Sequence, residues 1–190
     1  MHTSPSDAFA AIENRRSQRK FLEKPVDRET LMRLFDAAVL APNHKMTEPW
    51  GFLVLGENAK RVYGETKAMR KVGDPTDAAG AEKAARIIDD IMAIPTIVAV
   101  TQKLTDDAVR REEDYAAVWM AIENMLIAAT AIGLGTKIHT GDILSEIPVR
   151  REFGVEEDER IVAIIDIGQA AELLPPKRRT PAAEKTRWLD

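Results

Sequence analysis

Cysteine is absent from the sequence, and histidine and serine are scarce. Without cysteine the chain cannot form disulfides, iron–sulfur clusters, thiolate zinc sites or a cysteine nucleophile. The three histidines, His2, His44 and His139, lack metal-ligand spacing, so no metal site is predicted. No Gly-x-Ser-x-Gly elbow, P-loop or His-Glu-x-x-His motif occurs. If the chain is an enzyme, we therefore expect a bound cofactor to carry the difficult chemistry.

An excess of basic residues is also missing: 27 Lys and Arg stand against 31 Asp and Glu, a net charge of −4. This balance argues against a nucleic-acid partner. The polar first ten residues do not resemble an export signal. The apolar stretch 115–132 carries Glu123 and Asn124 at its centre, which disfavours a membrane span. We expect a cytoplasmic protein without nucleic-acid or membrane contacts.

Hydrophobic spacing predicts an α+β fold in one domain, residues 1–190. Four or five strands flanked by helices are expected, and the last twenty residues, about 170–190, should form an extended arm because they contain three prolines. Asp27 is a suitable N-cap for the second helix, and a proline ends it. The predicted helices cover residues 6–15, 30–40, 58–71, 77–92, 107–132 and 143–153, and the predicted strands 51–55, 96–101, 136–139 and 161–168.

The helix predicted over residues 107–132 is apolar nearly all round from Ala116 onward. A helix without a polar face must be covered on every side. One domain of this size rarely encloses a helix alone, so a second subunit is the simpler explanation.

Two basic clusters stand out, residues 15–20 and residues 177–179. Guanidinium groups match phosphate oxygens in shape and charge, and Ser17 adds a hydroxyl. If the clusters converge, they would hold a phosphomonoester. The alternative interpretation is two solvated charge runs.

Four ordered motifs carry a family resemblance. They are the run Arg15-Arg16-Ser17-Gln18-Arg19-Lys20-Phe21, the Ala41–Trp50 segment, the central helix with Gly133-Leu134-Gly135, and the last strand with Pro175–Pro181. Together they resemble the FMN-dependent nitroreductase family. The Ala-Pro-Asn-His-Lys segment at residues 41–45 is similar to its minimal-size branch.

The resemblance implies a mostly antiparallel sheet and an intertwined homodimer with two FMN sites at the subunit interface. It implies ping-pong transfer of hydride from NADH or NADPH through flavin N5 to a nitroaromatic, quinone or related small acceptor. No side chain is expected to act as a catalytic acid or base. The residues that the resemblance assigns to the cofactor are Arg15, Arg16, Ser17, Arg19, Lys177 and Arg179 around the phosphate and ribityl chain, His44 from the other subunit, and Ile138, His139 and Thr140 along the isoalloxazine ring.

Alternatives stay open for several of these residues. His44 can be a cation at a helix C-terminus, and His139 a core histidine. Lys177 and Arg179 can be surface residues in salt bridges. At the level of the whole protein, the rivals are a non-catalytic flavin carrier or sensor, and a cofactor-free dimeric interaction protein with an acidic partner. The residues select neither the acceptor nor one of the two nicotinamides.

Overall fold

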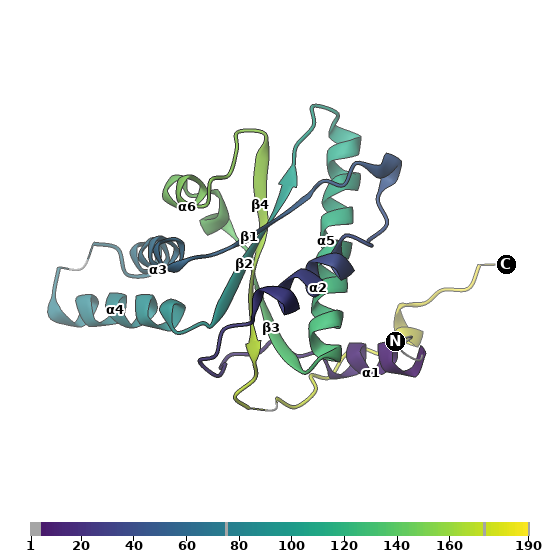
Figure 1. Cartoon of the computed structure of the whole chain (residues 1–190), viewed down its shortest axis with the longest axis horizontal. Coiled ribbons are helices and arrows are strands. Elements are labelled where there is room, and N and C mark those ends of the chain that lie inside the picture. The colour runs from purple at the N-terminus through teal and green to yellow at the C-terminus, as the bar shows by residue number, and fades with distance from the viewer. Residues whose placement is uncertain (1–4, 75, 173, 190) are drawn as a thin grey trace.

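The computed structural model describes residues 5–74, 76–172 and 174–189, and its centre is one antiparallel sheet (Figure 1). The strand order is β1-β2-β4-β3, and each neighbouring pair is antiparallel. β2 and β4 are long β-branched runs buried on both faces, as central strands require. The predicted α+β fold with a four-stranded sheet is confirmed. The strands are β1 (Trp50–Val54), β2 (Thr96–Lys103), β3 (Leu134–His139) and β4 (Glu159–Gln169).

Helices cover both faces of the sheet (Figure 1). On one face, α2 and α5 enclose the larger core, which includes Val98 of β2 and Ile165 of β4. On the other face, α3, α4 and α6 enclose a second core around Tyr63 and Ile164. The helices are α1 (Pro5–Asn14), α2 (Arg28–Ala38), α3 (Glu57–Val72), α4 (Ala78–Met92), α5 (Ala108–Ala131) and α6 (Ile147–Glu152), and the 3-10 turns are η1 (His44–Met46), η2 (Asp142–Ser145) and η3 (Ala182–Lys185).

Aspartate caps begin three of the helices. The Asp27 carboxylate accepts a hydrogen bond from the backbone N–H of Thr30 at 2.8 Å. Asp77 and Asp107 accept equivalent bonds at the starts of α4 and α5. Each bond satisfies a backbone donor that the first helical turn leaves free, which is why these starts were predictable.

The long helix α5 is only partly covered within one chain. Ala121 and Met125 are fully buried. Met120 is 40% exposed, and Ala116 and Ala131 are exposed as well. The expectation of cover on every side therefore is not met by one chain alone, and an apolar strip of α5 faces outward.

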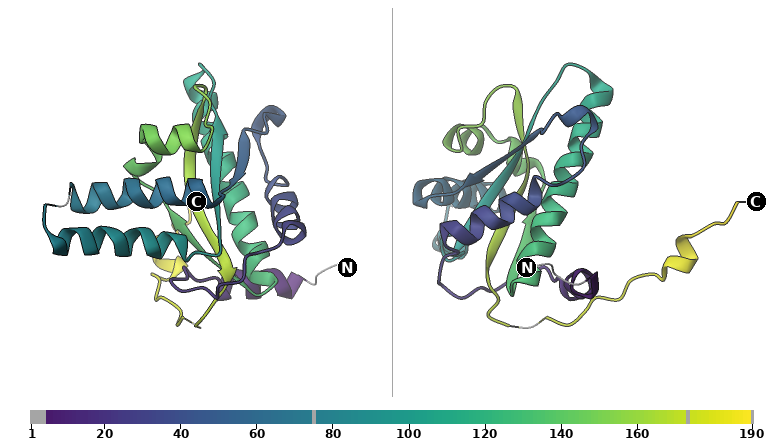
Figure 2. Two further views of the ribbon diagram at one scale, coloured as in Figure 1. Left: turned by 60° about the vertical axis from the view of Figure 1, so that its left-hand side comes forward. Right: turned by 45° about the vertical axis from the view of Figure 1, so that its right-hand side comes forward.

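Most predicted boundaries shift by one or two residues in the structure, and one predicted helix is divided. The helix expected over 143–153 is divided at Glu146, whose extended backbone separates η2 from α6. Pro148 explains the break, because proline fits only the first turn of a helix. β3 begins at Leu134, directly after Gly133 turns with a φ of 82°. The arm contains the short turn η3, and beyond the sheet it extends away from the body (Figure 2).

Within residues 5–74, 76–172 and 174–189, no helix is both long and apolar enough to cross a membrane.

Candidate cofactor site

The arginine-bearing segment 15–21 is fixed against the sheet by backbone hydrogen bonds. The N–H of Gln18 donates to the carbonyl of Thr136 on β3 at 2.8 Å. The N–H of Ala171 donates to the carbonyl of Lys20 at 3.1 Å. Gly135 permits this approach, since a Cβ there would lie 2.4 Å from Cγ of Gln18. The second glycine of the Gly-Leu-Gly motif therefore lets the basic segment lie flat on β3.

The first cavity, which we call the arginine pocket, joins the start of the chain to its arm. Its volume is about 390 Å³. Arg15, Arg16 and Ser17 line it from one side, and Lys177 and Arg179 line it from the arm. Among the residues that the structure describes, none of these four cations has a salt bridge. Glu13 also lines the pocket, so four cations stand against one carboxylate, and this excess of positive charge can bind a compact dianion.

Arg16 is the most constrained of these cations. One end of its guanidinium donates to the carbonyls of Glu13 and Arg15, at 2.6 and 2.9 Å. Its Nε is buried and has no partner in the described chain. A buried donor without an acceptor is costly, so Arg16 Nε is an unsatisfied donor in a residue that lines the pocket.

The second cavity, the lysine cavity, adjoins the same segment and has a volume of about 650 Å³. Segment 15–21 supplies its rim, the sheet supplies its floor, and the hairpin of α3 and α4 supplies its wall. The side chains that reach it include Arg19, Lys20, Phe21, Lys67, Lys71, Ile87, Asp90, Lys137, His139 and Asp166.

A buried pair forms the floor of the lysine cavity. His139 Nε2 lies 2.6 Å from Asp166 Oδ2, and Asp166 is 1% exposed. The other carboxylate oxygen of Asp166 is buried without a partner in the described chain. Burial, with a smaller contribution from the Asp166 charge, raises the pKa of the neighbouring Tyr63 hydroxyl. The phenol therefore stays protonated.

Three orphan atoms provide a test of whether FMN fits. The buried polar atoms without a partner are Arg16 Nε, Gln18 Oε1 and Asp166 Oδ1. The donor lies at the arginine pocket, and an acceptor lies on the floor of the lysine cavity. Gln18 lies between Ser17 of one cavity and Arg19 of the other. FMN carries phosphate acceptors at one end and an N–H on its ring, so a donor beside the arginine pocket and an acceptor on the floor of the lysine cavity are compatible with it.

The remaining predicted residues lie elsewhere in the single chain. Ile138 packs into the larger core, on the sheet face opposite His139, because neighbouring residues of a strand point to opposite faces. Thr140 lines a separate hollow of about 310 Å³ with Tyr115. His44 lines neither cavity, and its Nδ1 lies 2.8 Å from a carboxylate oxygen of Glu113 at the start of α5.

The charged residues of the lysine cavity that the predicted site lacks include Lys67, Lys71, Lys137 and Asp166. Two signals were available. Asp166 interrupts an apolar run that forms a central strand, where an unpaired carboxylate is unfavourable. Lys67 and Lys71 are four residues apart, which places both on one face of α3.

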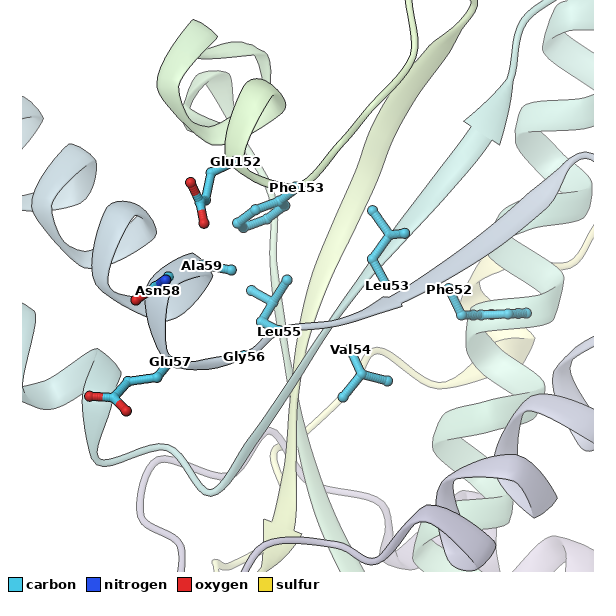
Figure 3. A pocket seen from close by; sticks show the side chains of 10 residues that line it. All are labelled: Phe52, Leu53, Val54, Leu55, Gly56, Glu57, Asn58, Ala59, Glu152 and Phe153. Atoms are coloured by element: carbon cyan, nitrogen blue, oxygen red, sulfur yellow. The ribbon is translucent and has the colours of Figure 1, made fainter.

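Another large hollow, of about 720 Å³, lies where β1 ends and α3 begins (Figure 3). Leu55 and Phe153 form its apolar part, and the carboxylates of Glu57 and Glu152 lie among its side chains (Figure 3). None of the predicted site residues lines it. Its acidic groups would repel a phosphate, so it does not compete with the arginine pocket.

Comparisons with known proteins identify relatives of this chain. The sequence profile of the Nitroreductase family matches residues 12–169. YfhC of Bacillus subtilis strain 168 is 31% identical over 175 residues, which cover 92% of this chain and 90% of YfhC.

Two solved structures extend the likeness to three dimensions. The nitroreductase-like family protein of Bacillus cereus is 29% identical with a TM-score of 0.83, covering 100% of this chain and 99% of that one. The nitroreductase NfnB of Sphigopyxis sp. strain HMH has the same fold at 20% identity, with a TM-score of 0.75 and coverage of 96% and 99%. Sequence motifs, fold and family profile coincide, and the chain belongs to the nitroreductase family.

Proposed function

We propose that the protein is an FMN-dependent NAD(P)H oxidoreductase that reduces a small acceptor such as a nitroaromatic or a quinone. The observation that carries the proposal is the meeting of Arg15 and Arg16 with Lys177 and Arg179 around one pocket, next to a second cavity large enough for a ring system. NfnB, which has the same fold, is described as an FMN- and NADPH-dependent nitroreductase.

In this proposal the two cavities divide the cofactor between them. Arg15, Arg16, Ser17, Lys177 and Arg179 hold the phosphate. Arg19 and His139 lie beside the isoalloxazine ring in the lysine cavity. Thr140 and, from the partner subunit, His44 are proposed to complete the ring site in the dimer, whereas Ile138 faces the larger core and is not part of it.

Bound FMN supplies hydride transfer between a reduced nicotinamide and the acceptor, in two half-reactions that share one pocket. The chain itself contributes orientation, which can lower a barrier by several kcal/mol. Arg19 contributes positive charge near the ring, where negative charge develops on reduction. This division of labour explains how a chain without a nucleophile or a metal motif can be an enzyme.

A homodimer is part of the proposal, and three exposed features support it. The apolar strip of α5 includes Met120, which is 40% exposed. Trp188 and Leu189, in the last described part of the arm, are 92% and 90% exposed. An apolar groove of about 750 Å³ lies between α2 and the edge strand β1. Exposed apolar surface of this kind is what a partner subunit would cover.

Purified protein should be yellow and should bind added FMN, which a cofactor-free interaction protein would not do. The double variant Arg15→Ala/Arg19→Ala should bind FMN more weakly, and unchanged affinity would remove those residues from the site. Stopped-flow mixing with NADPH should bleach the flavin band near ~450 nm, a property of oxidised flavin itself. A flavin carrier or sensor would not be reduced at a useful rate.

A further inference from the structure

The lysine cavity holds more positive charge than its own residues neutralise. Five cations line it, Arg19, Lys20, Lys67, Lys71 and Lys137, against the two carboxylates Asp90 and Asp166. In the described part of the chain none of the five has a salt bridge.

Three arginines of the same helices that lie outside the cavity lining have carboxylate partners. Arg61 pairs with Glu57, Arg70 with Glu146, and Arg86 with Glu82. The lysine at position 60 is also satisfied, because its Nζ donates to the carbonyls of Ile94 and Pro95. Within the described residues Lys83 of α4 also lacks a salt bridge, but it is exposed to water, whereas the cavity brings five cations without salt bridges together.

Lys67 shows that the charged form of a cavity lysine is disfavoured by its surroundings. It is half-buried, and its Nζ lies 5.6 Å from the centre of the Tyr63 ring. Burial lowers the pKa of Lys67, and the nearby charge of Lys137 lowers it further. Three ammonium groups that repel one another beside a half-buried site favour an anionic partner.

If the proposed function holds, neither FMN nor the protein neutralises the positive charge of these three lysines. The FMN phosphate is assigned to the arginine pocket, where four other cations line the wall. Asp166 is already engaged by His139 at 2.6 Å. Arg19 alone provides a positive charge for the ring. Lys67, Lys71 and Lys137 remain for whatever enters the cavity after FMN.

We propose that Lys67, Lys71 and Lys137 form a site for an oxyanion, a carboxylate or a phosphate, carried by the second molecule that enters the lysine cavity beside the flavin. The assignment rests on the proposed function, since it takes the flavin ring to share this cavity. Two sources fit the chemistry: a carboxylate on the electron acceptor, or the extra phosphate that distinguishes NADPH from NADH.

The test uses the full-length, FMN-loaded protein with its flavin oxidised, so that binding is measured without turnover. Isothermal titration calorimetry compares 4-nitrobenzoate with its neutral methyl ester, and NADP⁺ with NAD⁺. We expect the more anionic member of at least one pair to bind about tenfold more tightly, since one charge-assisted contact contributes about 1.5–3 kcal/mol. The pair that shows the preference identifies the source.

Variants locate the preference. In Lys67→Met and in Lys137→Met the ratio of affinities for the more and the less anionic ligand should fall to about twofold or less. Lys67→Arg should keep the wild-type ratio because the charge is retained. Lys83→Met is the matched control: it removes an exposed cation of α4 that does not line the cavity, and it should bind like wild type.

The outcomes separate this site from the proposed function. If the protein binds FMN but neither ligand pair shows a preference for the more anionic member, the lysine site is overturned and the proposed function is not. A preference that survives Lys67→Met and Lys137→Met also overturns it. If those variants instead weaken FMN binding but not riboflavin binding, the lysines hold the flavin phosphate and the inference is wrong. Protein that takes up no FMN overturns the proposed function and this assignment together.

Discussion

Replacing Gly135 by alanine tests how the basic segment is held on the sheet. The added Cβ would lie 2.4 Å from Cγ of Gln18 and 3.3 Å from Cβ of Ala170. Gln18 is 6% exposed and its backbone is bonded to Thr136, so it has little room to retreat. Overpacking of this kind costs about 1–3 kcal/mol.

The expected result is a melting temperature lower by about 2–10 °C, measured by circular dichroism, since 1 kcal/mol shifts a domain of this size by about 2–4 °C. FMN affinity should also fall, because Arg15 and Arg19 flank the displaced residue. Gly133→Ala is the matched control. Its φ of 82° is strained for alanine, but nothing lies within 4 Å of the added Cβ.

Gly133→Ala should therefore lose stability while FMN affinity, measured by flavin fluorescence on saturated folded protein, stays near the wild-type value. If Gly135→Ala melts and binds FMN like wild type, the packing of segment 15–21 on β3 is not as described. If both variants lose FMN affinity equally, general destabilisation explains the loss.

Three further predictions follow from the same geometry. Asp166→Ala should lower the free energy of unfolding in urea by about 1–3 kcal/mol, because His139 loses its buried partner; an unchanged midpoint would contradict the pair. The pKa of Lys67 is lower in the folded state than in the unfolded state, so the unfolded state binds more protons at pH values between the two. The stability of the wild type relative to Lys67→Met should therefore rise as the pH increases from neutral through that interval. Parallel pH profiles of the two proteins would show that Lys67 is not desolvated. Met120→Glu places a charge on the exposed strip of α5 and should convert the proposed dimer to a monomer in light scattering, whereas persistence of a dimer would move the interface off that strip.

Much of the fold could be predicted because its signals are local. Asp27 and Asp107 each precede an amphipathic or apolar segment and supply the cap that the backbone requires. The β-branched run ending in Gly168 could only be a central strand. The division of the helix near Glu146 was missed, although Pro148 offered a local signal.

The site was predictable only in part, because it depends on which face each residue takes. His139 and Ile138 are neighbours in sequence but lie on opposite faces of β3. The approach of Gln18 to Gly135 joins residues more than a hundred positions apart, which no periodicity reveals. Lys137 and Lys67 likewise line one cavity only because the side chain of Lys137 lies on the face of the sheet that α3 covers.

The central claim is that the arginines near the start of the chain and the cations of the arm hold one phosphate. The most direct test is the ratio of riboflavin to FMN dissociation constants in wild type and in Arg15→Ala/Lys177→Ala. We predict that wild type prefers FMN by about a hundredfold, the effect of one or two charge-assisted contacts, and that the double variant loses most of this preference while still binding riboflavin. Equal affinities in wild type, or a preference that the double variant retains in full, would contradict the account.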